Sequence, residues 1–188
     1  MFSEEQGRLL TTLARAAITR EFDRSIAAPP YPDWLKASGA VFVTLTEAGR
    51  LRGCIGSLEA HRPLGEDLEQ NARAAAFRDP RFPPLAQVEL PRVRVEVSVL
   101  TPATPMTFTD EDDALAQLRP GVDGVILEQG YHLSYHRSTF LPQVWEQLPD
   151  PRQFLSHLKQ KAGLSGDFWA KDVRLSRYGV EKFKEDLA

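Results

Sequence analysis

Residues 40–58, AVFVTLTEAGRLRGCIGSL, carry the clearest evidence for the fold class of this chain. Apolar and polar residues alternate through residues 40–46, and a second strand-like run follows at 50–58, which is the period-two pattern of β-strands. Three residues, Glu-Ala-Gly at 47–49, separate the two runs. A short connection containing glycine is typical of a hairpin. The sequence therefore predicts two antiparallel strands here.

Strands and helices are predicted on both sides of this hairpin without a regular βα alternation. The clearest strand is RVRVEVSVL at 92–100, which places four valines on one face and polar residues on the other. Helices are expected at 3–24, at 63–77, from Asp150 to Gly163, and as a short helix capped by Thr109 and Asp112; a second hairpin is expected at 122–137, turning near 128–130, and a final strand at 172–180. This mixture indicates an α+β fold, a mainly antiparallel sheet covered by helices. No domain boundary is visible, so one domain over residues 1–188 is expected.

The composition indicates a globular protein with a slightly acidic balance. The chain has 188 residues, 42% of them hydrophobic and 26% charged, with a formal net charge of −3. A nucleic-acid binder usually carries a basic surface. The arginines between residues 50 and 94 could supply one, but acidic residues are interspersed among them, so nucleic-acid binding is the weakest of the functions considered.

The N-terminal residues and the length of the apolar runs indicate where in the cell the protein is expected. The N-terminus lacks the apolar region of a secretory signal, and no apolar run approaches the ~18 residues of a membrane helix. A single cysteine suits a reducing compartment. A cytoplasmic protein without membrane attachment is therefore expected.

Residues 50–56 contain this single cysteine between two glycines. If strand alternation continues through them, Arg52, Cys54 and Gly56 share one face. A guanidinium beside a thiol favours the thiolate. Gly56 would leave open space on that face, and Gly53 would let another backbone approach the other face. The alternative is an inert, buried cysteine, with glycines that mark a bulge or tight packing.

A carboxylate and two histidines are the other candidates for proton transfer. Glu96, among the valines of the third strand, is either an ion-pair partner of an arginine or a general acid/base. His132 and His136 would share a strand face about 13 Å apart, too far to chelate one ion, and either could act as a base for Cys54. The favoured interpretation of both histidines is a solvated polar face of a hairpin. No zinc, nucleotide or serine-hydrolase motif occurs, so no metal ion or cofactor is expected.

The turn RDPRF at 78–82 has two interpretations. Asp79 can cap the turn and hold Arg78 or Arg81, which is the favoured interpretation because aspartate commonly bonds the backbone two residues on. Alternatively, the arginines bind an anion.

Five segments, in this order, resemble one known family. They are LRGCIGSLE (51–59), NARAAAFRDPRFPPL (71–85), VRVEVSVLTP (93–102), TFLPQVWEQL (139–148) and FLSHLKQKAGL (154–164). From about residue 5 to 185 the chain resembles the domain named after the Alport syndrome, mental retardation, midface hypoplasia and elliptocytosis chromosomal region. The prokaryotic members are called AmmeMemoRadiSam system protein A.

This resemblance implies an α+β fold with a larger and a smaller lobe, and it implies no particular reaction. It also implies that the RGCIG segment lines a cleft, which makes Arg52, Gly53, Ile55 and Gly56 candidate substrate-binding residues. The system name implies two protein partners, a radical S-adenosylmethionine protein and a Memo-type protein of dioxygenase-like fold. His132 and His136 match no motif of the family.

Two functions are compatible with the sequence. The first is an enzyme that uses Cys54 and Glu96 on a small or anionic substrate, which Arg52 orients. The second is a non-catalytic binding or adaptor module for the two implied partners, in which the RGCIG segment shapes a docking groove. An enzyme should place a titratable group within hydrogen-bond reach of Cys54, whereas a binding module should show a broad surface without one.

Overall fold

The computed structural model describes residues 1–27 and 29–186, and the predicted first hairpin is confirmed. Its strands are β2 (Val41–Glu47) and β3 (Arg50–Gly56), which pair antiparallel. The turn residues Ala48 and Gly49 have φ angles of 49° and 76°. Positive φ at both positions of a two-residue turn matches the right-handed twist of the flanking strands.

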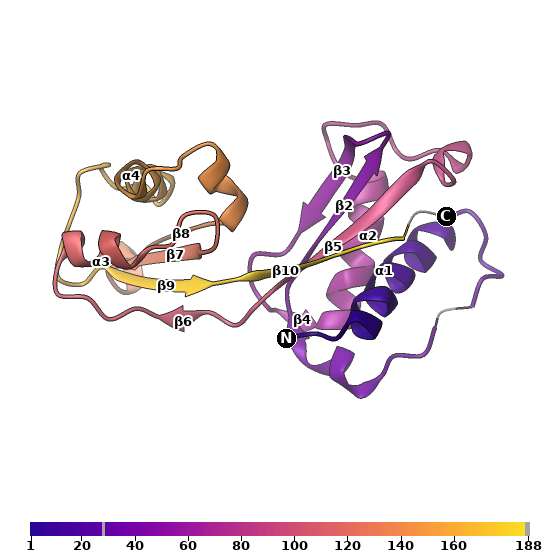
Figure 1. The fold of residues 1–188 in the computed structure, drawn as a ribbon, viewed down its shortest axis with the longest axis horizontal. Coiled ribbons are helices and arrows are strands. Elements are labelled where there is room, and N and C mark those ends of the chain that lie inside the picture. The colour runs from indigo at the N-terminus through magenta and orange to yellow at the C-terminus, as the bar shows by residue number, and fades with distance from the viewer. Residues whose placement is uncertain (28, 187–188) are drawn as a thin grey trace. The chain divides into compact units, whose positions relative to one another are not determined.

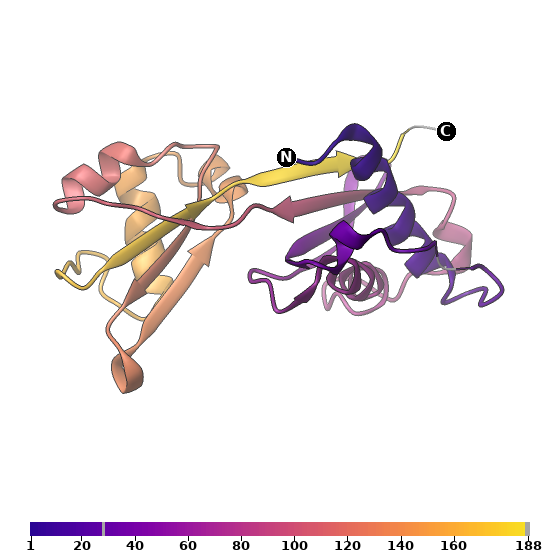
Figure 2. The same ribbon diagram turned by 90° about the horizontal axis from the view of Figure 1, so that it is seen from below.

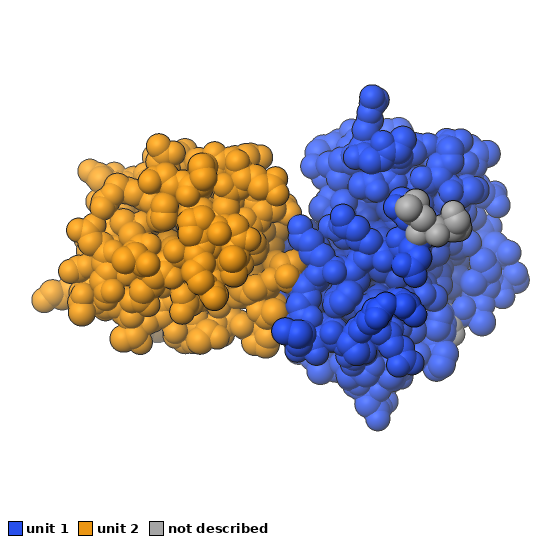
Figure 3. All heavy atoms as spheres, viewed as in Figure 1, with its two compact units in different colours: residues 1–100, 181–188 blue, residues 101–180 orange. Residues whose placement is uncertain are grey.

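The described chain forms two compact units, which Figure 3 colours separately. Unit 1 is Met1–Leu100 with Glu181–Ala188, and the smaller unit 2 is Thr101–Val180. Unit 2 is thus inserted between two strands of unit 1. This boundary was not predicted, because the chain leaves unit 1 directly after the strand expected at 92–100, and the proline-containing segment 101–106 that follows is equally typical of an ordinary loop.

Unit 1 is a four-stranded sheet with two helices on one face (Figures 1 and 2). Its strand order is β10-β5-β2-β3, where the further elements are β5 (Val93–Leu100), β10 (Val180–Lys184), α1 (Glu4–Thr19) and α2 (Leu64–Phe77). The helix α2 packs on β2 and β3, and α1 packs on β5. The four valines of β5 are buried against them, which confirms the predicted register of this strand. We call the opposite side of the sheet the outer face.

Unit 2 is a second four-stranded antiparallel sheet packed against a helix. Its strand order is β6-β9-β7-β8, formed by β6 (Thr104–Pro105), β7 (Gly124–Gln129), β8 (His136–Phe140) and β9 (Arg174–Tyr178), with helices α3 (Glu111–Gln117) and α4 (Pro151–Lys161). Asp150 caps α4 as predicted, because its side chain accepts a hydrogen bond from the Gln153 N–H. In the core, the Trp145 and Phe154 rings stack 3.7 Å apart.

Short elements complete the described chain. They are the strand pair β1 (Ser38–Gly39) and β4 (Arg62–Pro63), and the 3-10 turns η1 (Asp33–Lys36), η2 (Gln87–Glu89), η3 (His132–Ser134) and η4 (Pro142–Glu146). No helix within residues 1–27 and 29–186 is both long enough and apolar enough to span a membrane.

Three details of the predicted elements are wrong. The cap of α3 is Asp110 and not Thr109, whose N–H bonds the Asp113 carboxylate instead. The second hairpin has a longer connection than expected, and residues 131–135 are not strand. The predicted final strand ends at Tyr178, and β10 follows it in the other sheet. β10 was not predicted as a separate strand because it is short and rich in charge, which is common in edge strands.

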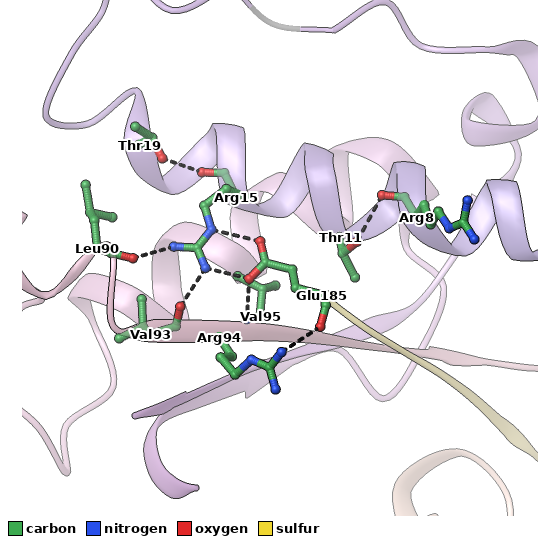
Figure 4. Close-up of polar contacts among 9 residues, drawn as sticks. All are labelled: Arg8, Thr11, Arg15, Thr19, Leu90, Val93, Arg94, Val95 and Glu185. Carbon is green, nitrogen blue, oxygen red and sulfur yellow. Dashed lines mark hydrogen bonds and ion pairs between the residues drawn. The ribbon is translucent and has the colours of Figure 1, made fainter. Parts of the chain in front are cut away.

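Glu185 fastens the C-terminal segment to unit 1 (Figure 4). Its backbone N–H donates to the carbonyl of Val95 at 3.0 Å, and its carboxylate accepts from the Val95 N–H at 2.9 Å. The same carboxylate accepts from Nε of Arg15 at 2.8 Å. Arg15 also donates to the carbonyls of Leu90 and Val93, so one guanidinium joins α1, β5 and the returning chain.

Candidate functional site

The two candidate catalytic residues belong to one row of side chains across the outer face. Cys54 on β3 is paired with Thr44 on β2, and Thr44 is paired with Glu96 on β5. Strands in a sheet lie about 4.8 Å apart, so Cys54 and Glu96 are separated by roughly 10 Å with Thr44 between them. The structure therefore places both residues on one surface without direct contact. We call these three residues the Cys54 row.

The thiol of Cys54 is hydrogen-bonded to a hydroxyl group. Its Sγ lies 3.2 Å from Oγ1 of Thr44, and the Cys54 residue is partly exposed. Thr44 was not among the predicted site residues. The polar residues that alternate along 40–46 were a signal for it, but the pairing register that brings it to the thiol was not readable.

The backbone of Cys54 is bonded by the turn that follows α2. The carboxylate of Asp79 accepts from the Cys54 N–H at 2.9 Å, and Nη2 of Arg81 donates to the Cys54 carbonyl at 3.2 Å. Because β3 is an edge strand, these two side chains supply the partners that a further strand would supply.

Asp79 and Arg81 also bind each other, which confirms the structural interpretation of the RDPRF turn. Arg81 donates from Nη2, from Nε and from its backbone N–H to the Asp79 carboxylate. The side-chain bond from Arg81, helped by the backbone N–H groups of Cys54 and Arg81, holds the pKa of Asp79 well below its usual range. Burial opposes this shift but does not outweigh it.

The expected pairing of Arg52 with the thiol is replaced by an ion pair with Glu89. Leu51 pairs with Thr46 and Gly53 with Leu45, so Arg52 is an extra residue in a β-bulge and the regular alternation is broken. Its Nε and Nη2 donate to the two Glu89 oxygens at 2.7 and 3.0 Å.

The reason for this partner is chemical as well as geometric. A carboxylate that accepts two parallel bonds is a stronger partner for a guanidinium than a thiol. The hydrogen bond from Arg52 is the main cause that lowers the pKa of Glu89. Nη1 of Arg52 is buried, and none of the residues that the structure describes accepts a hydrogen bond from it. The Phe82 ring lies 5.9 Å from the Arg52 Cζ, within cation–π range.

The two glycines that flank Cys54 have different roles. A Cβ on Gly53 would lie 2.1 Å from the Ala75 carbonyl oxygen, which confirms that Gly53 permits close approach of another backbone. A Cβ on Gly56 would lie 2.2 Å from Cγ of Phe42. The expectation of open space at Gly56 is therefore wrong, because the cross-strand phenylalanine ring fills it. Ile55 packs against the hydrophobic core of unit 1.

Glu96 forms an ion pair, but not with an arginine. Its carboxylate lies 3.1 Å from Nζ of Lys184, which is on β10. The side chain of Glu96 is 21% exposed and that of Lys184 is 72% exposed, so the ion pair is accessible to solvent.

The two candidate histidines lie in unit 2. His132 is exposed in the η3 turn with a φ of 51°, and Nδ1 of His136 lies 2.9 Å from the Ala162 carbonyl oxygen. Their predicted common strand face is wrong, because His132 is not in a strand. Among the residues that the structure describes, no three His, Cys, Asp or Glu side chains are grouped as metal ligands.

A polar cluster at the start of β2 and the end of β3 bonds these strands to α2. Asp67 accepts from the Val41 N–H at 3.0 Å and from the Ser57 hydroxyl at 2.6 Å. Asn71 donates to Asp67, to Ser57 and to the Val41 carbonyl. Since these residues bond one another, the cluster has a structural role, and it holds β2 and the end of β3 in place.

Comparisons with known proteins agree on one family. The sequence model of the AMMECR1 family matches residues 11–183, across both units. A protein of Methanothermobacter thermautotrophicus is 40% identical and covers 98% of this chain and 96% of its own length. Protein MJ0810 of Methanocaldococcus jannaschii is 37% identical, covering 96% of this chain and 90% of that protein.

A solved structure shares the fold. The crystal structure of the uncharacterized protein PH0010 from Pyrococcus horikoshii matches with a TM-score of 0.78 and 34% sequence identity. The match covers 98% of this chain and 94% of that one. Family, relatives and fold agree, and the chain belongs to the AMMECR1 family.

Proposed function

We propose that this chain is a cytoplasmic, non-catalytic binding module whose recognition surface is the outer face of unit 1 around the Cys54 row. One observation carries this proposal: among the described residues, the hydrogen-bond partner of the thiol is the Thr44 hydroxyl. A neutral hydroxyl does not serve as the general base that activates a cysteine nucleophile. The geometry therefore favours recognition over covalent catalysis.

The surface is suited to recognition because its backbone is fixed. Asp79 and Arg81 bond the N–H and C=O of Cys54, and Asp67 bonds the start of β2. Binding residues on strands are positioned more accurately than residues on loops. A thiol, a hydroxyl and a carboxylate paired with Lys184 give a mixed polar strip, which suits a protein partner. The candidate partners are the radical S-adenosylmethionine protein and the Memo-type protein that the family resemblance implies.

The test is to measure binding of these two proteins, taken from the same genome, to the full chain by biolayer interferometry. Thr44→Lys adds a long charged side chain at the centre of the row and should weaken binding about tenfold or more. Thr12→Lys, the same change at an exposed position of α1, is the matched control and should bind like the wild type.

If Thr44→Lys does not fold, the same binding measurement is made with a second variant, Glu96→Gln. Glu96→Gln removes one charge of the row without adding volume. Equal affinities for all variants, or no binding of either partner to the wild type, would contradict the proposed function.

A reactive thiol is the second candidate, and one observation favours it. Arg81, whose side chain is 54% exposed, donates to the Cys54 carbonyl, so an accessible cation lies beside the residue. A small anionic substrate could be oriented there, with Cys54 as nucleophile. Native-state alkylation by iodoacetamide tests this. The enzyme hypothesis is supported if Cys54 is alkylated in the native state, if Arg81→Gln slows this alkylation and if Arg52→Gln does not. Alkylation that occurs only when the protein unfolds would contradict it.

A further inference from the structure

The connection between β7 and β8 presents two exposed tyrosines that the proposed function does not use. Tyr131 is 66% exposed and Tyr135 is 45% exposed. In Figure 2 this hairpin runs away from the rest of unit 2 and ends in the η3 turn. We call residues 130–135 the tyrosine tip. Exposure of a large aromatic ring to water is unfavourable, and two such residues on one loop are typical of a binding surface.

The tyrosine tip is bonded to the neighbouring strand rather than free. The Asp172 carboxylate accepts from the Gly130 N–H at 3.1 Å and from Nε2 of Gln129 at 2.9 Å. Nη2 of Arg174 donates to the Gly130 carbonyl at 3.1 Å. Gly130 has a φ of 75°, and a Cβ there would lie 2.0 Å from the Ser134 carbonyl oxygen. Only glycine therefore lets the chain close on itself at the base of the tip.

Both tyrosine side chains are held in place by residues of the adjoining strands β7 and β9. Cζ of Arg174 lies 4.5 Å from the centre of the Tyr131 ring, and the Tyr135 hydroxyl bonds the Glu128 carboxylate. A rigid aromatic side chain loses little conformational entropy when it is buried by a partner. Residues of this kind commonly contribute most of the affinity at protein interfaces.

The charges around the tip define the partner. The exposed Lys171, with Arg174 and Arg137, surrounds the base of the tip, against the two carboxylates of Asp172 and Glu128. Nε of Arg137 lies 3.5 Å from the Glu128 carboxylate and offsets its charge. The ionisable groups around the tip therefore carry a net positive charge. We propose that the tyrosine tip inserts into an apolar pocket with an acidic rim on another protein. Nucleic acid is a poorer partner, because the chain has a net charge of −3 and phosphate binding depends on local cations.

The test is site-specific photocrosslinking of the full chain in the organism that encodes it. The photoreactive residue p-benzoyl-phenylalanine replaces Tyr131 in one version and Tyr135 in a second. It replaces Val122, an exposed apolar residue of the same unit, in the control. A discrete protein adduct is expected from 131 and 135 and not from 122. The crosslinked peptide should come from an apolar pocket flanked by Asp and Glu.

Charge reversal makes the test specific for the acidic rim. Lys171→Glu, combined with the photoreactive residue at 131, should lower the adduct yield about fivefold or more. No adduct, an adduct from 122 as well, or a yield that Lys171→Glu leaves unchanged would overturn the proposal. An adduct that ribonuclease or deoxyribonuclease removes, or one formed with a second copy of this chain, would also overturn it.

Discussion

The carboxylate of Asp79 accepts a 2.9 Å hydrogen bond from the backbone N–H of Cys54, although 25 residues separate the two along the chain. Cys54 is on an edge strand, where an N–H and a C=O would otherwise face solvent or attract another strand. Arg81, bonded to the same carboxylate, covers the C=O. The turn after α2 thus satisfies the free backbone groups of β3 at Cys54, the candidate site residue.

The first prediction concerns Asp79 and pH. Its pKa is lowered in the folded state, mainly by the hydrogen bond from Arg81, so its stabilising effect is complete above the ordinary aspartate value of ~3.9. The effect is lost as the pH falls from there through the lowered folded value. Asp79→Asn should cost about 1–3 kcal/mol at pH 7 and progressively less below about pH 4. Urea unfolding at pH 7 and pH 3 measures this.

The matched control is Asp33→Asn, in an exposed pair with Lys36. Its free energy of unfolding should change by about 0.5 kcal/mol or less. If Asp79→Asn lost as much stability at pH 3 as at pH 7, the carboxylate would not be the source of the effect.

Gly53→Ala should destabilise unit 1. The new methyl group would meet the Ala75 carbonyl oxygen of α2 at 2.1 Å, and neither backbone can yield without moving the helix from the sheet. The expected cost is about 1–3 kcal/mol or more. Gly179→Ala is the control, because its Cβ would make ordinary contacts of 3.5 Å or longer with Thr101. Thermal denaturation of the two variants should separate them clearly, and equal midpoints would argue against the tight approach.

Arg52→Lys should lower the free energy of unfolding, although the substitution keeps the positive charge. Lysine cannot form the two parallel bonds that Arg52 makes to Glu89, and this pair is largely buried. A loss of about 1–2 kcal/mol in urea unfolding is expected. Arg92→Lys, in the exposed pair with Glu47, should be nearly neutral. A neutral result at both positions would mean that the buried pair contributes no more than the exposed one.

Glu185→Gln should loosen the returning C-terminal segment. The variant keeps the size of the side chain but removes the charge that Arg15 and the Val95 N–H both bind. Amide hydrogen exchange at Val95 should become faster, and the free energy of unfolding should fall by about 1–3 kcal/mol. Glu4→Gln, in an exposed pair with Arg8, should leave both quantities unchanged. Unaltered protection of the Val95 amide would contradict the role given to Glu185.

Elements whose signals are local could be predicted from the amino-acid sequence. Strand alternation located the hairpin at 40–58 and the buried face of 92–100, and the aspartate–proline pair at 150–151 marked the start of α4. These predictions succeeded because side-chain periodicity and helix capping depend on residues only a few positions apart. Cys54 and Glu96 were also predicted as candidate site residues from the sequence, and both lie on one face of one sheet.

The contacts between distant side chains could not be predicted from the sequence and depend on the folded chain. Arg52 binds Glu89 rather than the thiol because a bulge interrupts β3, and Glu96 pairs with Lys184 because the chain returns to unit 1 after an entire second unit. Arg15 and Glu185, 170 residues apart, meet for the same reason. Such pairs depend on strand register and on the path of the whole chain. Both are set by the combined packing of all the elements, and no local pattern encodes them.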